Sequence, residues 1–342
     1  MGIFRLMLQR KYSKATVLLN VIICVLLLLV SYSIIVNRQY IIDQITVWQF
    51  QSTSQLDNLV DRSGVNDYGK FLYHASQPNL DATQTFNEEC DRIENTTSIL
   101  GCYKNSRIYI YDISDAQLDG IREVTATHET LHAAYERLSI SDQLKINVLL
   151  DAEYSKLAGN KDYTDRMAFY ARTEPGERDN ELHSVIGTEI ADISPELETY
   201  YSKYFSNRQK VVSLNTKYSS VFINLKNKAN ALATQLNALS TSINSQSAEY
   251  NAEAIILNKD IATFNSKASS GGFTSTSQFN YERAILSSRV ATANELRDSV
   301  NNDIATYAAT LKEYNSIATE SKTLYNTIDS TLAPAPSVTP ST

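Results

Sequence analysis

The chain has 342 residues, a formal net charge of −7 and 43% hydrophobic residues. This size allows one or two globular domains with a packed core, and the composition excludes a mainly disordered chain. Four of the 31 basic residues, and none of the 38 acidic ones, lie in the first 36 positions. The remainder is therefore acidic. This argues against a nucleic-acid partner, because phosphate contacts need a basic surface.

Residues 15–36 form a stretch of 22 positions without a charged side chain. At about 1.5 Å per residue, a transmembrane helix of this length crosses a hydrocarbon core of about 30 Å. Basic residues precede the stretch, and Arg38 alone follows it closely, so the positive-inside rule places residues 1–14 in the cytoplasm. We expect a single-pass protein of the cell membrane with its remaining residues extracytoplasmic. The alternative is a signal peptide cleaved at Ser31-Tyr32-Ser33, although the apolar stretch is long for one.

The cysteines follow the same division. Cys24 lies in the apolar stretch, whereas Cys90 and Cys102 lie in the part expected outside the cytoplasm. An oxidising compartment permits a disulfide, so a bridge between Cys90 and Cys102 is predicted, with two reduced thiols as the alternative. Between them, Asn95-Thr96-Thr97 fits the glycosylation sequon.

The predicted fold is mainly α. Residues 37–65 are polar with scattered apolar side chains and are predicted to form a juxtamembrane stalk. Residues 66–204 are predicted to form an α+β catalytic domain with a small sheet. Two runs are rich in β-prone residues, 71–74 and, more clearly, 107–111, where aromatic residues alternate with isoleucines.

A helix is predicted next. Ser114 and Gln117 fit an S-x-x-Q capping box at its start. Apolar side chains, together with His128, then recur at helical spacing: Ile121, Val124, His128, Leu131, Tyr135 and Leu138. Further helices are predicted at about 142–157 and from about 178, with Pro195 marking the end or a kink of the latter.

Residues 205–332 are predicted to form a long antiparallel coiled-coil hairpin of two helices. A seven-residue repeat marks the first arm: Ala229, Leu236, Ile243, Tyr250, Leu257 and Phe264. A Ser/Gly break at 269–272 separates it from a second arm that starts near residue 278, and so short a connection favours antiparallel neighbours. The seam could also serve a coiled-coil partner or self-association. The Pro/Ser/Thr-rich residues 333–342 are predicted to be a disordered tail.

The clearest chemical signal is His128-Glu129-Thr130-Leu131-His132. Histidines four positions apart on a helix project from one face and can hold one metal ion. A bound Zn²⁺ lowers the pKa of its water from about 15.7 towards about 7, and an adjacent carboxylate can take the proton as the hydroxide attacks a carbonyl. The motif therefore predicts a zinc-dependent hydrolase with His128 and His132 as ligands and Glu129 as the catalytic base.

Catalytic zinc normally takes three protein ligands, so a third must come from elsewhere. A metzincin continuation fails, because Tyr135 and Leu138 stand where that pattern has Gly and His. Downstream, Asn180-Glu181-Leu182-His183-Ser184 resembles the N-E-x-x-S-D helix of gluzincins, the thermolysin-like zinc peptidases whose third ligand is that Glu. The resemblance implies that Glu181 is the third ligand. It departs from the family at Val185, where gluzincins have an Asp that orients a ligating His.

Other assignments stay open. His183 and Glu189 are the main alternatives to Glu181, followed by Glu174, Glu177 and Asp192. Three side chains could stabilise the oxyanion: Tyr135, Tyr170 and His183. The resemblance also implies that residues 107–111, just upstream of the active helix, offer a sheet edge to an extended peptide substrate. The alternative for this segment is an ordinary core strand.

The function that these patterns favour is a membrane-anchored, extracytoplasmic zinc metallopeptidase acting on peptide or protein substrates. The alternative is a structural or adhesion protein of the cell envelope in which the hairpin is functional and the zinc site is non-catalytic. A third possibility is a module that binds peptides and zinc without hydrolysing them.

Overall fold

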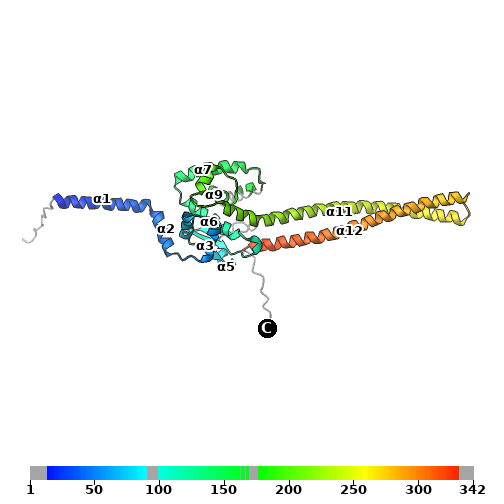
Figure 1. The fold of residues 1–342 in the computed structure, drawn as a ribbon, viewed down its shortest axis with the longest axis horizontal. Helices are drawn as coiled ribbons and strands as arrows, with labels where there is room; N and C mark the ends of the chain where they lie inside the picture. Colours follow the sequence, from blue (N-terminus) through cyan, green and yellow to red (C-terminus); the bar gives the residue numbers. More distant parts are fainter. Residues whose placement is uncertain (1–13, 91–98, 162, 166, 169–175, 331–342) are drawn as a thin grey trace, which may run out of the picture. The chain divides into compact units, whose positions relative to one another are not determined.

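The computed structural model describes residues 14–90, 99–161, 163–165, 167–168 and 176–330 (Figure 1). This part of the chain is mainly helical with one small sheet, which confirms the predicted class. It divides into two compact units, one comprising the described residues up to Lys217 together with Ser330, the other Tyr218–Asp329. The predicted sequon at 95–97 and the predicted tail at 333–342 lie outside the described residues.

Helix α1, Lys14–Val36, contains the predicted apolar span. Its segment Ala15–Val36 has a mean hydropathy of 2.8, and none of it is buried inside the protein. A helix of this length and composition can cross a membrane, and a signal sequence near an N-terminus has the same properties.

The predicted stalk at 37–65 is folded into the first unit. Helix α2, Arg38–Gln49, contributes the buried Asp43, and helix α3, Ser54–Arg62, contributes buried apolar residues. These are Leu56, Leu59 and Val60. Arg62 also forms an ion pair with the buried Glu123. This segment therefore supports the domain that follows it.

Residues 71–74 are helical, so the prediction of a strand there was wrong. They belong to helix α4, Asp67–Ala75, whose N-cap Asn66 accepts a hydrogen bond from the Gly69 amide at 3.0 Å. Leu72 and Tyr73, adjacent on this helix, are both buried. A strand would direct two consecutive side chains to opposite faces, whereas the capped helix buries both in one core.

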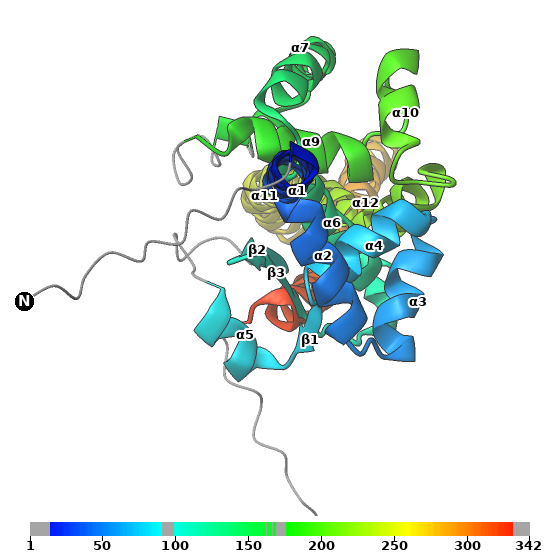
Figure 2. The ribbon, with the colours of Figure 1, turned by 90° about the vertical axis from the view of Figure 1, so that its left-hand side faces the viewer.

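The sheet has three strands: β1 (Asn79–Asp81), β2 (Gly101–Lys104) and β3 (Arg107–Tyr111). Strand β3 matches the prediction at 107–111 and lies in the centre, parallel to β1 and antiparallel to β2 (Figure 2). The expectation that it offers an edge to a substrate was therefore wrong. Its isoleucines alternate with aromatic residues because both faces of this central strand are covered.

The disulfide between Cys90 and Cys102 confirms the predicted bridge. It joins the C-cap of helix α5, Thr83–Glu89, to strand β2. On the same side, Phe86 of α5 packs in a buried cluster with Cys90 and Tyr109. The disulfide thus holds β2 to the helix that covers one face of the sheet.

The motif helix is α6, Ile121–Glu136. The predicted capping box at Ser114 and Gln117 was wrong. Instead, the Asp115 side chain accepts a hydrogen bond from the Gln117 amide and caps a short 3-10 helix, η1 (Ala116–Leu118). The capping residue is thus Asp115 and not Ser114. Helix α6 begins three residues after the end of η1.

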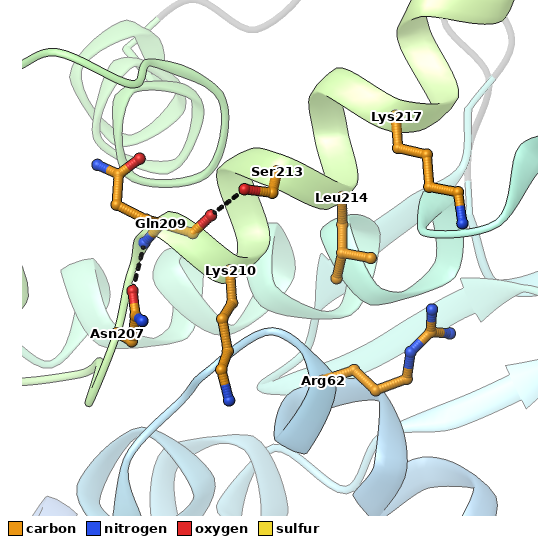
Figure 3. Close-up of a pocket in the computed structure, with 7 residues that line it drawn as sticks. All are labelled: Arg62, Asn207, Gln209, Lys210, Ser213, Leu214 and Lys217. Atoms are coloured by element: carbon orange, nitrogen blue, oxygen red, sulfur yellow. Dashed lines mark hydrogen bonds between the residues drawn. The ribbon is translucent and has the colours of Figure 1, made fainter.

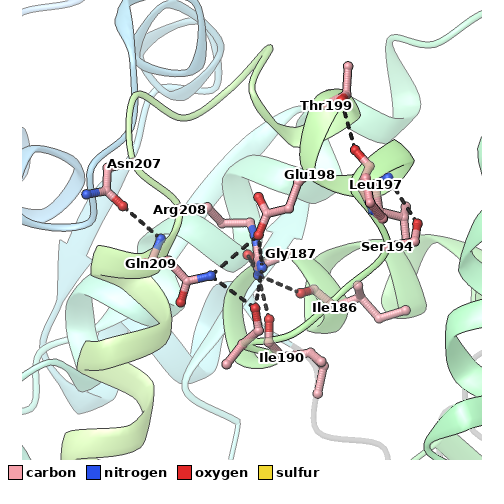
Figure 4. A network of polar contacts seen from close by, with 12 residues as sticks. Ile186, Gly187, Ile190, Ser194, Leu197, Glu198, Thr199, Asn207, Arg208 and Gln209 are labelled. Carbon is pink, nitrogen blue, oxygen red and sulfur yellow. Dashed lines mark hydrogen bonds and ion pairs between the residues drawn. The ribbon is translucent and has the colours of Figure 1, made fainter.

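Helices at about 142–157 and from 178 are confirmed as α7, Ile140–Lys156, and α9, Arg178–Glu189. Pro195 does not kink α9 but lies in the first turn of a separate helix, α10 (Pro195–Tyr201). The buried guanidinium of Arg208 closes the C-terminal end of α9 by donating to four backbone carbonyls and to Glu198 (Figure 4). These carbonyls belong to Ile186, Gly187, Ile190 and Ala191.

The second unit is built from two long helices. Helix α11, Gln209–Ser269, starts in the first unit, and its residues from Tyr218 pair with α12, Thr276–Ile328. The pairing is antiparallel, since contacts join later residues of α11 to earlier residues of α12. They include Phe222 with Tyr325, Ser242 with Asp303, and Lys267 with Glu282. The break predicted at 269–272 is confirmed, but residues 205–217, predicted to begin the hairpin, belong to the first unit.

Along α11, one series of less exposed positions follows alternating spacings of three and four: 222, 225, 229, 232, 236, 239, 243, 246, 250, 253, 257, 260, 264 and 267. Polar residues at four of these positions, including Lys267, have partners on α12. Arg289 pairs with both Glu253 and Asp260, and Gln246 donates to Asp303. Whether the side chains interlock as a coiled coil stays a prediction.

Candidate metal centre

Helices α6 and α9 pack directly against each other. The contact is close because Gly187 has no side chain: a Cβ there would lie 2.4 Å from Leu131 Cδ1 and 2.8 Å from the Tyr201 ring. Leu131 belongs to the motif at 128–132, so the motif itself packs against α9 at Gly187. Two helices that are distant in sequence thereby share one buried surface.

The contact brings Glu181 to the two histidines of the motif. Its Oε1 lies 3.3 Å from His132 Nε2, its Oε2 lies 3.6 Å from His128 Nε2, and the two Nε2 atoms are 3.1 Å apart. Ligand atoms about 2.1 Å from a tetrahedral ion are separated by about 3.4 Å. The three side chains therefore form a group that could hold a metal ion.

Burial of the carboxylate supports the same conclusion. Glu181 is 6% exposed, and its Oε2 is buried without a hydrogen bond from any residue that the structure describes. An unsatisfied buried carboxylate oxygen costs several kcal/mol unless something compensates it. A cation between Glu181 and the imidazoles would supply the missing partner, so these residues fit a metal ion.

Charge coupling within the group is strong. Burial opposes a charged imidazole at His132, but the Glu181 carboxylate outweighs it and raises the pKa of His132 to about 10. Burial likewise opposes a charged Glu181, but its interactions with His132, and then with His128, keep the pKa of this carboxyl well below its usual value. Without a metal, a proton on His132 therefore takes the place of the cation.

The imidazole of His132 is oriented by the residue next to Glu181. Asn180 Oδ1 lies 3.0 Å from His132 Nδ1, and the Asn180 amide group donates to Glu177 Oε2 at 3.1 Å. An amide oxygen only accepts, so Nδ1 carries the proton and Nε2 is left as the ligand atom. Sequence reasoning assigned Asn180 no role beyond its place in the N-E pattern, although its position directly before Glu181 was the available signal.

The alternatives for the third ligand lie elsewhere. His183 is fully buried, its Nε2 lies 2.9 Å from the Tyr200 hydroxyl, and burial lowers its pKa to about 3. Glu189 is the last residue of α9, Glu177 contacts Asn180, and Asp192 is exposed. None of these is in the group that could hold a metal among the described residues. Glu174 lies outside the described residues.

Two of the oxyanion candidates, Tyr135 and His183, are engaged with other side chains. Tyr135 is buried and donates its hydroxyl hydrogen to Asn147 at 2.9 Å. The ring of His183 lies within an aromatic cluster, with Tyr135, Tyr200, Tyr201 and Tyr204 around it. Tyr170 lies outside the described residues. No oxyanion role is shown for any of them.

Glu129 lies under strand β2. Its side chain is buried, and a Cβ added at Gly101 would lie 2.8 Å from Glu129 Oε1 and 2.5 Å from Thr125 Cγ2. Only a glycine therefore lets β2 pass this close to α6. Among the described strands, β2 is bonded to β3 on one side only.

A cavity of about 410 Å³ in the first unit lies away from this group, near the start of α11 (Figure 3). Three basic residues line it, Arg62, Lys210 and Lys217, but none of the metal-binding candidates does. Asp119 pairs with both Arg62 and Lys217, which offsets much of the positive charge. The cavity is therefore not part of the candidate centre.

No protein-family model, no curated protein and no solved structure matches this chain. The resemblance to gluzincins accordingly rests on the motif at 128–132 and the segment at 180–184.

Proposed function

We propose that the protein is a membrane-anchored zinc metallopeptidase that acts outside the cytoplasm. The observation that carries the proposal is the arrangement of His128, His132 and Glu181 around one point, next to the buried carboxylate of Glu129. Two imidazoles and one carboxylate are a ligand set of catalytic zinc, which keeps a fourth position open for water.

Each residue has a role in this proposal. His128 and His132 offer their Nε2 atoms and Glu181 its carboxylate to the metal. Zinc, when bound, acidifies a coordinated water. Glu129 would serve as the base that takes a proton from the attacking water and returns it to the leaving amine. Asn180 keeps the His132 imidazole in the ligating tautomer.

Among the described strands, β2 is an outer neighbour of β3, and this position favours a peptide substrate. An extended peptide can add to a sheet edge through main-chain hydrogen bonds. Gly101 on this strand is next to Glu129, so a peptide paired with β2 would lie near the proposed base. In this proposal β2 takes the role that the sequence assigned to residues 107–111.

The membrane and compartment assignments have separate support. Helix α1 is long and apolar enough to span a membrane, and the basic residues before it favour a cytoplasmic N-terminus. The disulfide between Cys90 and Cys102 fits an oxidising compartment for the domain after the span.

The test combines metal analysis with one substitution. Purified protein should contain about one zinc per chain, and Glu129→Gln should keep the metal while losing about 100-fold or more in hydrolysis of mixed peptides. Glu136→Gln, an exposed glutamate at the end of the same helix, is the matched control and should be active. Absence of metal from the purified protein, or unchanged hydrolysis by Glu129→Gln, would contradict the proposal.

A structural function for the second unit is the alternative. It is favoured by the extent of the α11–α12 pair and by its polar contacts, such as Arg289 with Glu253 and Asp260. In that case deletion of residues 218–329 should abolish the cellular function, while Glu129→Gln should leave it intact.

A further inference from the structure

The outer face of helix α2 is apolar and exposed. Ile41, Ile45 and Trp48, spaced by four and three residues, form a stripe on this face, and Ile42 flanks it. Trp48 is 86% exposed, the highest value among the exposed large hydrophobic side chains. The opposite side of α2 faces the protein, where Asp43 is buried and Tyr40 contacts Phe71. A single helix thus has one face in the domain and one apolar face without a partner among the described residues.

The position of α2 in the chain indicates what covers that face. Only Asn37 separates α2 from Val36, the last residue of the apolar helix α1. If α1 spans a bilayer, α2 starts at the level of the lipid headgroups. Tryptophan is enriched at this level, and a helix with an apolar face can lie in it with that face towards the acyl chains.

Helix α2 is also fastened to the helix of the metal centre. Arg137 donates to both carboxylate oxygens of Asp43 at 2.8 and 2.9 Å, and both side chains are buried. The same guanidinium donates to the Ala133 carbonyl near the end of α6 at 2.8 Å. Arg137 follows His132 by five residues, which is about 8 Å along a helix axis. The height of the metal centre above α2 is therefore fixed by a short, buried connection.

We propose that the outer face of α2 rests on the membrane that α1 spans, and that the substrates are polypeptides anchored in the same membrane and cut close to its surface. This inference rests on the proposed peptidase function. Confinement to one membrane raises the effective concentration of anchored substrates over soluble ones, without any further contact. The fixed connection through Asp43 and Arg137 limits how far from the bilayer a peptide bond can reach the centre.

The first experiment uses Trp48 as a probe, because it is the only tryptophan in the chain. Full-length protein is reconstituted into phosphatidylcholine vesicles, with and without lipids that carry a nitroxide near the headgroup. We expect Trp48 emission to be blue-shifted from that of tryptophan in water, quenched by the nitroxide lipids and little affected by aqueous iodide. Emission like that in water, with strong iodide quenching, would overturn the placement. Shielding from both quenchers would also overturn it, since a second protein copy would then cover the face.

The second experiment measures the height of cleavage. Single-pass reporter proteins carry the same cleavable sequence at increasing distances from the membrane, and are reconstituted with the peptidase. We expect the nearest site to be cut at least about tenfold faster than the same peptide free in solution. Equal cleavage at all heights, with normal hydrolysis of soluble peptides, would refute the inference while leaving the peptidase function standing.

A variant with a matched control ties the two results together. The triple variant Ile41→Ser, Ile45→Ser and Trp48→Ser should lose the preference for the nearest site but keep soluble-peptide hydrolysis and bound zinc. The control changes two isoleucines and one aromatic residue, all exposed, in the second unit: Ile255→Ser, Ile256→Ser and Tyr281→Ser. It should keep the preference. If wild-type protein hydrolyses no peptide at all, the peptidase proposal fails, and the Trp48 measurement still decides where α2 lies.

Discussion

Asn180 accepts a hydrogen bond from His132 Nδ1 at 3.0 Å, while Glu181, the next residue, faces the Nε2 of the same imidazole at 3.3 Å. One turn of α9 thus supplies both the side chain that orients the ring and the carboxylate that meets it. Because both residues belong to α9 and His132 belongs to α6, the geometry of the centre depends on the packing of α9 against α6.

Removal of the Asn180 amide should weaken metal binding. Asn180→Leu keeps the approximate volume but leaves His132 Nδ1 without its acceptor, and loss of such a partner lowers metal affinity about 10- to 100-fold. Competition with a chelator measures this affinity. Asn180→Asp retains an acceptor oxygen and should bind at least as tightly as wild type. Equal affinities of the Leu variant and wild type would show that Asn180 does not orient the ligand.

Metal affinity should rise with pH. Zinc needs a neutral imidazole, and in the metal-free protein the pKa of His132 is raised to about 10, so binding at pH 7 to 9 displaces its proton. With one proton released, the affinity should increase about tenfold per pH unit in this range. Calorimetry in two buffers of different ionisation enthalpy counts the protons. Binding without proton release would contradict the charge state of the pair.

The raised pKa of His132 should also make the stability of the metal-free protein depend on pH. Because the folded pKa of His132 lies above its ordinary value of 6.5, its charged form stabilises the fold fully below about pH 6.5. That contribution is lost as the pH rises through about 10. After chelation, the thermal midpoint should therefore fall between pH 7 and pH 10, and His132→Gln should flatten this decline.

Loss of the Arg208 guanidinium should destabilise the first unit. It donates to four carbonyls at the end of α9, and each buried acceptor left without a donor costs about 1–3 kcal/mol. Arg208→Ala should therefore lower the free energy of unfolding by about 3 kcal/mol or more. Arg297 is the control: it lies on the exposed surface of α12, and its ion-pair partner among the described residues is the neighbouring Asp298. Arg297→Ala should change the free energy of unfolding by less than about 0.5 kcal/mol. Denaturant titration compares the two.

A side chain at Gly101 should impair the base more than the metal. The Cβ of Gly101→Ala would lie 2.8 Å from Glu129 Oε1, so Glu129 or β2 must move. A displaced base loses part of the about 100-fold that such a group contributes, so kcat/KM should fall about tenfold or more while zinc content is kept. Gly159→Ala places its Cβ in open space and should be neutral. Loss of zinc with activity would instead indicate general misfolding.

Short-range patterns in the sequence were sufficient for several elements. The alternating run at 107–111, the Ser/Gly break at 269–272 and the histidine spacing of four each depend on neighbours within one strand, turn or helix. Glu181 was also identified before its position was known, and the structure places it beside both histidines, although its role as a ligand stays a prediction.

What the sequence did not provide depends on distant residues. The helix at 71–74 forms because Asn66 caps it and the core accepts Leu72 and Tyr73 together. The central position of β3 follows from β1 on its other side, about 30 residues earlier in the chain. Likewise, nothing local to Arg208 indicates that it closes a helix ending near Glu189. These relationships arise only when separate elements meet.

The bridge between Cys90 and Cys102 lies one residue from Gly101, the residue that passes beside Glu129. While the two thiols are reduced, β2 lacks its covalent tie to α5, and its bonds to β3 remain. If the domain lies outside the cytoplasm as proposed, an oxidising compartment would add that tie to the strand that passes beside Glu129.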